Sequence, residues 1–135
     1  MQLPMLKAKL HRLVVTEADL NYVGSITLDE ALLEVSGIRP YELVTITNTA
    51  NGAFWQTYVI AGPKGSGTVC LNGSSARHFA PGDIIIVMAY NHYDEKELEH
   101  YQPKVILVDG KNRVTDVIVD EKPFTTTDKA RMPRG

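Results

Sequence analysis

Short extended segments separated by turn residues dominate this sequence, and they restrict the chain to a mainly β fold. Between residues 5 and 16, apolar side chains such as Leu6 and Ala8 alternate with charged ones such as Lys7, which is the period of a half-buried strand. Asn51-Gly52 is a strong signal for a tight turn between two such segments. We expect strands at residues 5–16, 22–27, 42–47, 54–60, 68–71, 84–89, 104–108 and 114–119.

Helical segments are few and short in this pattern. Thr27-Leu28-Asp29-Glu30 is a capping box that opens a helix over residues 28–36, and Gly37 closes that helix. Two further helical turns are expected, one ending at His78 and one over residues 93–101. About seven or eight short strands with so few helices predict a small β-barrel with helical crossovers.

Length and composition favour one domain and argue against nucleic-acid or membrane partners. The 135 residues suffice for a single core. Fourteen Lys and Arg against sixteen Asp and Glu give a net charge of −2, which leaves no basic surplus to neutralise phosphates. The longest apolar run, residues 84–90, is too short for a membrane span, and charges interrupt every N-terminal apolar stretch, unlike in a signal peptide. We expect a soluble, cytoplasmic protein with one domain over residues 1–119 and a mobile tail over residues 120–135.

Three familiar functional motifs are incomplete in this sequence: a phosphate-binding loop, a metal site and a hydrolase triad. Gly62-Pro63-Lys64-Gly65-Ser66-Gly67 is rich in glycine but lacks the Gly-Lys-Ser/Thr ending that places a lysine on a phosphate. The four histidines show no metal-ligand spacing, and a single cysteine, Cys70, excludes an internal disulfide, so we expect no metal site. A hydrolase triad with Ser25 and His11 lacks the nucleophile-elbow pattern around the serine.

A set of short motifs carries a resemblance to one known family. The motifs are Met5-Leu6, Lys9-Leu10-His11-Arg12, Val15-Thr16, Ala18-Asp19-Leu20, Tyr22-x-Gly24-Ser25, Asn51-Gly52, Thr57-Tyr58, Gly65-Ser66, Asn72-Gly73 and Pro81-Gly82-Asp83. Together they resemble the pyruvoyl-dependent aspartate 1-decarboxylase family over residues 1–119. The Gly24-Ser25 pair alone would indicate only a strand bulge, whereas its combination with the flanking motifs is specific.

The resemblance implies a double-psi β-barrel, a homotetramer, and an inactive proenzyme that cuts itself between Gly24 and Ser25. Cleavage would yield a short β chain, residues 1–24, and an α chain, residues 25–135, with a covalent pyruvoyl cofactor derived from Ser25. A serine hydroxyl can attack the preceding carbonyl only in a strained backbone geometry, and Gly24 offers room and unusual backbone angles there. The resulting ester eliminates, and the dehydroalanine hydrolyses to a ketone. Whether a separate maturation factor takes part stays open.

The same resemblance assigns roles to the matching residues. As the pyruvoyl group, residue 25 forms a Schiff base with the substrate amine and accepts the electrons released with carbon dioxide. Thr57 assists the acyl shift at the scissile carbonyl, and Tyr58 donates a proton to the carbanion. Lys9 contacts the substrate carboxylate. The residues expected near the cleavage site, or lining the cofactor and substrate, are His11, Tyr22, Asn72, Gly73, Ser74, Ser75 and Ala76.

Position 54 breaks the family pattern. The family has an arginine there that holds a substrate carboxylate, and this chain has Phe54, which offers no hydrogen-bond donor. The small Ala-Ala pair that follows Asn72-Gly73 in the family is also replaced, by Ser74-Ser75. Because neighbouring strand side chains point to opposite faces, Phe54 should face the site and Trp55 should face away.

Three functions therefore stay open. The first is the family default, decarboxylation of L-aspartate to β-alanine, a precursor of pantothenate and coenzyme A, with Lys9, Arg77 or Arg12 holding the acidic side chain. The second is decarboxylation of a less polar amino acid such as methionine, with Phe54 lining an apolar pocket. The third is a non-catalytic binding barrel, against which the intact cleavage motif argues.

Overall fold

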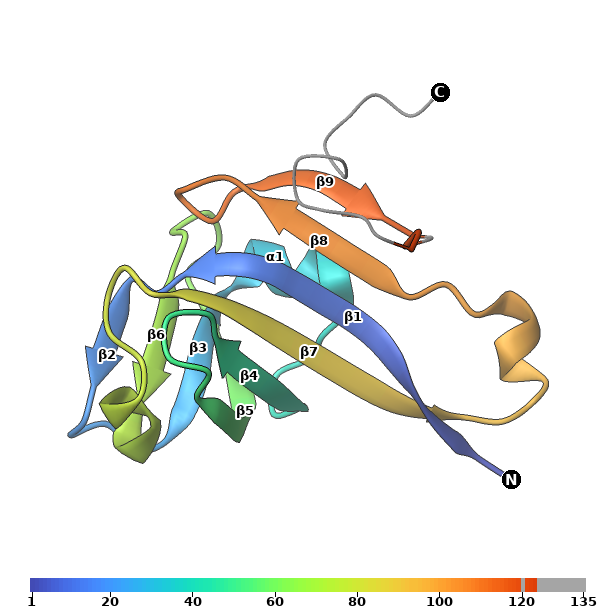
Figure 1. Cartoon of the computed structure of the whole chain (residues 1–135), viewed down its shortest axis with the longest axis horizontal. Helices are drawn as coiled ribbons and strands as arrows, with labels where there is room; N and C mark the ends of the chain where they lie inside the picture. The colour runs from blue at the N-terminus through green and yellow to red at the C-terminus, as the bar shows by residue number, and fades with distance from the viewer. Residues whose placement is uncertain (120, 124–135) are drawn as a thin grey trace.

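Strands are the main regular structure among the residues that the computed structural model describes, which are 1–119 and 121–123 (Figure 1). The strands are β1 (Leu3–Val14), β2 (Glu17–Asp19), β3 (Ser25–Asp29), β4 (Leu43–Asn48), β5 (Phe54–Gly62), β6 (Val69–Asn72), β7 (Ile84–Tyr93), β8 (Lys104–Val108) and β9 (Val114–Ile118). The helices are α1 (Glu30–Ser36) and two short 3₁₀ helices, η1 (Gly73–Arg77) and η2 (Glu97–His100).

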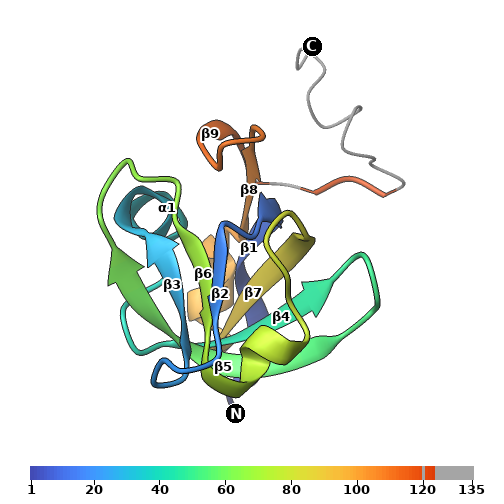
Figure 2. The same cartoon turned by 90° about the vertical axis from the view of Figure 1, so that its left-hand side faces the viewer.

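The strands form one sheet in the order β2-β6-β3-β5-β4-β7-β1-β8-β9. β1 and β2 follow each other in the chain but lie far apart in this order, so Val15 and Thr16 carry the chain from β7 and β8 to β6. Thr16 fixes the crossing, since its backbone N–H and its hydroxyl both donate to the Val69 carbonyl, at 2.8 and 3.1 Å. Seen end-on, the strands surround one core, and the predicted double-psi β-barrel class is confirmed (Figure 2).

The Asn112 side chain holds the other end of this crossing. Its Oδ1 accepts from the Val14 N–H at 2.8 Å, and its Nδ2 donates to the Val14 carbonyl at 2.8 Å and to the Gly67 carbonyl at 2.9 Å. Asn112 is 2% exposed. Loss of these bonds would leave buried backbone groups unpaired, so the end of β1 is fixed to the turn before β9.

The core lies between the inward faces of the strands, and α1 packs against β1, β3 and β8 beside it. Its largest side chains, each at most 1% exposed, are Leu10, Leu13, Ile26, Leu28, Leu32, Ile46, Leu71, Phe79, Ile85 and Ile106. In β1 the buried positions alternate with charged ones, as the sequence predicts. This alternation leaves Lys7, Lys9 and His11 on the outer face of the sheet.

Most predicted elements are confirmed, but several boundaries are wrong. The strand expected at residues 84–89 continues to Tyr93, the helical turn expected over 93–101 is limited to 97–100, and the sequence pattern does not predict β2. The strand expected at residues 5–16 ends at Val14, because the chain crosses to a new partner there. The strand expected at residues 22–27 begins only at Ser25. Tyr22 is 58% exposed, and the segment up to Gly24 has no strand partner among the described residues. The domain limits of 1–119 stay a prediction, and most of the expected tail lies outside the described residues.

The start of α1 also differs from the prediction. The N-cap is Asp29 rather than Thr27, because residues 27–29 continue β3 beside β5. The end is as expected: Gly37, at φ 77°, donates its N–H to the Leu33 carbonyl. Among the described residues, helices are all too short or too polar to cross a membrane.

Asp29 ties the start of α1 to the loop before β6. Its Oδ1 accepts from the backbone N–H groups of Ala31 and Gly65, at 2.8 and 2.9 Å, and its Oδ2 accepts from that of Gly67 at 2.8 Å. Burial acts to raise the pKa of Asp29, but these hydrogen bonds outweigh it and hold the pKa below the ordinary 3.8. A lowered folded pKa means that the carboxylate stabilises the fold at neutral pH, and that this contribution is lost as pH falls through the folded pKa.

We therefore expect Asp29→Asn to lower the free energy of unfolding at pH 7 by about 2 kcal/mol, because the amide replaces a charged acceptor of three N–H groups. The loss should shrink as pH falls below about 4 and through the lowered pKa of folded Asp29, because the wild-type carboxyl then becomes protonated as well. Urea unfolding at several pH values, in a Ser25→Ala background that prevents the predicted cleavage, measures it. Glu95→Gln, an exposed carboxylate, is the control, and a difference independent of pH would contradict the expectation.

Candidate active site

The ends of β3, β5 and β6 place the predicted site residues other than Lys9 and His11 at one end of the barrel. β3 and β5 are parallel, so the Gly24 end of β3 and the Phe54 end of β5 lie together. β6 runs antiparallel to β3, so η1, which follows Asn72, begins at the same end. Figure 2 shows this end at the bottom, where η1, coloured yellow-green, lies below β5 and beside the loop after β2. Residues distant in sequence thus converge around the Gly24–Ser25 peptide.

Ser25 is buried and held in an unusual backbone conformation. It is 1% exposed, and its φ of 143° lies in a region that residues with side chains rarely adopt. Asn72 pairs with Ser25 across the sheet, and its Nδ2 donates to Ser25 Oγ and to Thr27 Oγ1, both at 3.1 Å. Strain of this kind costs about 1–3 kcal/mol and persists only where the surroundings impose it. The positive φ falls on Ser25 and not on Gly24, where the sequence reasoning had placed it.

The backbone of Gly73 lies close to the backbone of the Gly24 segment. Its φ is 70°, and a Cβ at this position would lie 2.9 Å from Gly24 Cα and 3.2 Å from the Tyr22 carbonyl oxygen. A Cβ at Gly24 would instead meet no atom within 4 Å outside its chain neighbours. The steric need for glycine in the intact chain is therefore at Gly73, which lets η1 approach the Gly24–Ser25 peptide.

The two serines after Gly73 have different surroundings. Ser75 is 1% exposed, and its hydroxyl donates to the Asn72 carbonyl at 2.9 Å, which closes the first turn of η1. Ser74 is exposed and Ala76 is half-buried. Of this pair, only Ser74 therefore presents an accessible hydroxyl at the barrel end.

Thr57 and Tyr58 lie on β5 at the height of Ser25 along the strands, with their side chains on opposite faces of the sheet. Val59 pairs with Ile26, so one step back along the parallel strands brings Tyr58 level with Ser25. Thr57 shares the inward face with its partner Val44, and strand alternation turns Tyr58 outward. The Tyr58 ring stacks on Tyr41, with centroids 6.0 Å apart.

Phe54 and Trp55 lie on opposite faces of β5, as predicted. Phe54 is 60% exposed on the outer face, and its cross-strand neighbour is the uncharged Thr47. Trp55 packs against the core and contacts His78, with ring centroids 5.8 Å apart. Phe54 thus shares a face with Tyr58, four residues further along the strand. That separation is about 13 Å.

Lys9 and His11 are not brought to Ser25 within one chain. Lys9 pairs with Met88, Met88 with Thr45, and Thr45 with Gln56, so three strand spacings separate Lys9 from β5. This is about 14 Å along the sheet. Lys9 Nζ instead lies 3.0 Å from Glu121 Oε1, which follows β9.

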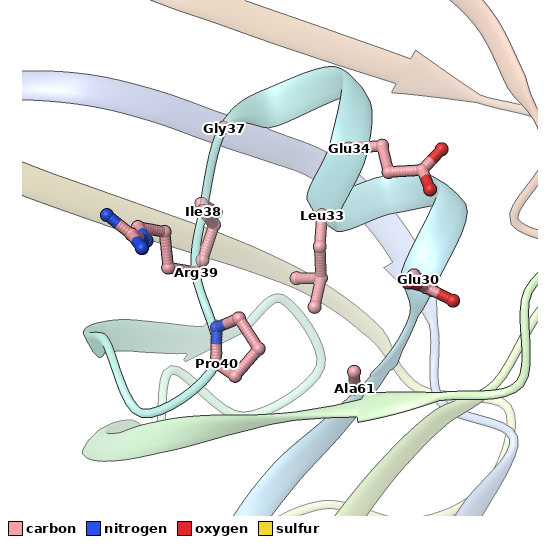
Figure 3. Close-up of a pocket in the computed structure, with 8 residues that line it drawn as sticks. All are labelled: Glu30, Leu33, Glu34, Gly37, Ile38, Arg39, Pro40 and Ala61. Carbon is pink, nitrogen blue, oxygen red and sulfur yellow. The ribbon is translucent and has the colours of Figure 1, made fainter.

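A shallow pocket lies away from these residues, on the other side of α1. Helix α1, the turn after it and Ala61 line a cavity of about 290 Å³ (Figure 3). Leu33 points from the helix toward Pro40 and Ala61, while Glu34 forms an ion pair with Lys64 at 2.8 Å. The pocket contains none of the predicted site residues and is separate from the barrel end with Ser25.

The sequence reasoning missed Thr27 and Cys70, which share the Asn72 side chain with Ser25. Cys70 Sγ lies 3.1 Å from Asn72 Oδ1, and Cys70 is 7% exposed. The signal was present in the sequence, since Ser25 and Thr27, like Cys70 and Asn72, are two residues apart and share a strand face.

Comparisons with known proteins agree with the family that the sequence motifs resemble. The family model described as aspartate decarboxylase matches residues 1–115. Aspartate 1-decarboxylase of Neisseria meningitidis is 54% identical over 121 residues, covering 90% of this chain and 95% of the relative. The enzymes of the same name from Syntrophobacter fumaroxidans and Lactiplantibacillus plantarum are 55% and 52% identical, covering 84% and 90% of this chain and 91% and 94% of the relatives. The chain belongs to the aspartate decarboxylase family. It is a carboxy-lyase.

Gly73→Ala and Gly52→Ala form a matched pair that tests the contact at Gly24. Both glycines have φ near 70°, but a Cβ at Gly52 would meet nothing within 4 Å. We expect Gly52→Ala to lower the free energy of unfolding by about 1 kcal/mol through backbone strain alone. Gly73→Ala should cost at least about 2 kcal/mol more, because the Gly24 backbone has to move. Urea unfolding in the Ser25→Ala background measures both, and equal losses would refute the close approach.

Proposed function

We propose that this chain is a self-processing amino-acid α-decarboxylase whose pyruvoyl cofactor is made from Ser25. The observation that carries the proposal is the buried, strained Ser25, whose Oγ accepts a hydrogen bond from Asn72 Nδ2 at 3.1 Å. A serine with only a structural role in a strand needs no positive φ, and it need not be as buried as Ser25, which is 1% exposed. Family membership supports the reaction class.

Self-cleavage would begin with attack of Ser25 Oγ on the Gly24 carbonyl carbon. The bond from Gly24 to the Ser25 nitrogen breaks, and an ester replaces it. The ester then eliminates, which releases the Gly24 carboxylate and leaves a double bond at residue 25. Water replaces the nitrogen, which leaves as ammonia. The Asn72 amide would stabilise negative charge on Oγ as the hydroxyl proton departs, and Thr57 would act at the carbonyl.

The residues around Ser25 fit a pyruvoyl group formed in place. The Asn72 amide already binds the Oγ position, and the absence of a Cβ at Gly73 leaves the Gly24–Ser25 peptide against the backbone of η1. Asn72, the Gly73 backbone and Ala76 would hold the group. When bound, it withdraws the electrons released as carbon dioxide leaves. Tyr58, level with residue 25 on the outer face, would give a proton to the substrate carbon.

L-Aspartate is the substrate that the relatives' name supports, with β-alanine and carbon dioxide as products. Arg77 ends η1 at the barrel end with Ser25, and it is exposed, so among the described residues it is the cation that we propose for the side-chain carboxylate. Arg12 lies on β1, where β7 loses register, and is further from β5 in the sheet order. A cytoplasmic location stays a prediction from the sequence, and the sequence leaves open whether a maturation factor takes part.

A homotetramer would complete the site. Lys9 is three strand spacings from β5, so a Lys9 that contacts substrate beside residue 25 has to belong to another copy of the chain. The outer face that carries β4, β5 and β7 also exposes large apolar side chains. Leu43, Phe54 and Tyr90 are 61%, 60% and 45% exposed, and a second copy would bury them.

A less polar amino acid, such as methionine, is the second candidate substrate, and Phe54 favours it. An exposed phenylalanine beside an uncharged threonine offers a carboxylate nothing to pair with. Burial of a substrate side chain against the ring would contribute about 1–2 kcal/mol for two methylene-sized groups.

Ser25→Ala should remain one uncut chain without decarboxylase activity, because it lacks the nucleophile. Intact mass spectrometry should show two fragments for the wild-type protein, split after Gly24, with residue 25 lacking its amine. Ser66→Ala, in the loop before β6, is the control and should cleave like the wild type. A cut Ser25→Ala chain would disprove the site, and an uncut wild type would support a non-catalytic barrel.

Tyr58→Phe should separate processing from catalysis. Removal of the phenol deletes the proposed proton donor and leaves the packing of the ring, so cleavage stays near normal while kcat falls roughly a hundredfold. Tyr41→Phe, in the stacked partner ring, is the matched control and should keep kcat. Undiminished turnover of Tyr58→Phe would assign the proton to another donor.

Phe54→Arg should discriminate between the two candidate substrates. If the natural substrate is apolar, the arginine should raise kcat/KM for aspartate by about tenfold or more and lower it for methionine. Phe54→Leu controls for loss of the ring without added charge. A wild-type protein that already turns over aspartate well, with no gain from Phe54→Arg, would exclude the apolar substrate and direct mutagenesis to Arg77.

A further inference from the structure

The Asn72 side chain has contacts on both ends of its amide. Nδ2 donates to Ser25 Oγ and Thr27 Oγ1, each at 3.1 Å, while Oδ1 lies 3.1 Å from Cys70 Sγ. All four residues lie on the outer face of β3 and β6, and Asn72 is 3% exposed. A buried amide has two orientations that differ by a half-turn, and its partners determine which one is populated.

We propose that Cys70 is a positioning residue for self-cleavage: its thiol donates to Asn72 Oδ1 and thereby keeps Nδ2 directed at Ser25 Oγ. The inference rests on the proposed function of Ser25. It adds a residue that lies two positions from Asn72 on β6 and pairs across the sheet with Thr27 instead of Ser25.

The orientation of the Asn72 amide decides whether Ser25 Oγ accepts a hydrogen bond or donates one. With Nδ2 toward Ser25, the oxygen receives a hydrogen bond that stabilises negative charge as the hydroxyl proton leaves. With the amide reversed, Oδ1 would accept from the Ser25 hydroxyl and hold the proton that has to depart. Nδ2 would then face sulfur, which is a weak acceptor. A thiol donor on Oδ1 disfavours the reversed state.

Cys70 stays a donor at neutral pH. Burial raises the pKa of its thiol, and the carboxylates of Glu17 and Asp19 on the neighbouring β2 raise it further. The protonated thiol therefore persists, and no thiolate competes with Ser25 as a nucleophile.

Three variants separate hydrogen bonding from packing. Cys70→Ser keeps a donor in a smaller side chain, Cys70→Val fills the space without a donor, and Cys70→Ala has neither. We expect Cys70→Ser to cleave within about twofold of the wild-type rate, and Cys70→Val and Cys70→Ala to be slower by about threefold to tenfold. Time courses of intact mass give the rates, and thermal unfolding confirms that each variant is folded.

A packing role would give a different pattern: Cys70→Val would match the wild type, and Cys70→Ser would be slowed together with Cys70→Ala. That outcome, or equal rates in all four proteins, would overturn the inference.

A second measurement does not depend on cleavage. In the Ser25→Ala background, Thr27 and Cys70 remain as partners of Asn72, whose side-chain amide can be followed by NMR and assigned by its loss in Asn72→Ala. We expect its hydrogen exchange to be about threefold or more faster with Cys70→Ala added, and unchanged with Cys70→Ser. Equal exchange in both would contradict the positioning role. An uncut wild-type chain would instead refute the proposed function, while the exchange result would still decide the role of Cys70.

Discussion

The crossing of the N-terminal strand at Val15 and Thr16 is the constraint on which the rest of the structure depends. Before it, β1 pairs with β7 and β8; after it, β2 pairs with β6. Asn112 holds one side of the crossing through the Val14 backbone, and the Val69 carbonyl holds the other through Thr16. Because β6 is thereby held between β2 and β3, Asn72 reaches the position opposite Ser25, and the barrel end can form.

The strain at Ser25 persists because its neighbours are fixed independently. Ser25 pairs with Asn72 of β6. Gly73, at the start of η1, lies close to the backbone of Gly24, and Ile26 is fully buried in the core. No single one of these contacts could impose a φ of 143°. The surrounding barrel absorbs a cost of about 1–3 kcal/mol, which is a small share of the burial energy of one core layer. Reactivity at one peptide therefore follows from the packing of three strands and η1.

The sequence predicts the strands of this fold well where apolar and polar side chains alternate because one face is buried, as in β1. It fails where long-range pairing decides the structure. The break after Val14 and the late start of β3 at Ser25 depend on partners more than 40 residues away, which local periodicity cannot show. The structure brings Ser25, Asn72 and Tyr58, to which the resemblance assigns roles, to one barrel end. The resemblance could not show that Lys9 lies three strands away, or that the thiol of Cys70 reaches the Asn72 amide, because both follow from sheet order and not from spacing.

The strand pairing of the first 24 residues has a consequence for the integrity of the protein. A cut after Gly24 leaves β1 and β2 joined to the rest of the molecule by non-covalent contacts, chiefly their pairing with β6, β7 and β8. The intact chain can fold as a single polymer, whereas the cut protein is a complex of two peptides. Its unfolding would release the short fragment into solution, so its apparent stability would rise with protein concentration, and refolding would require the two fragments to meet again. After such maturation, the stability of the folded protein would depend on association of the two fragments as well as on folding.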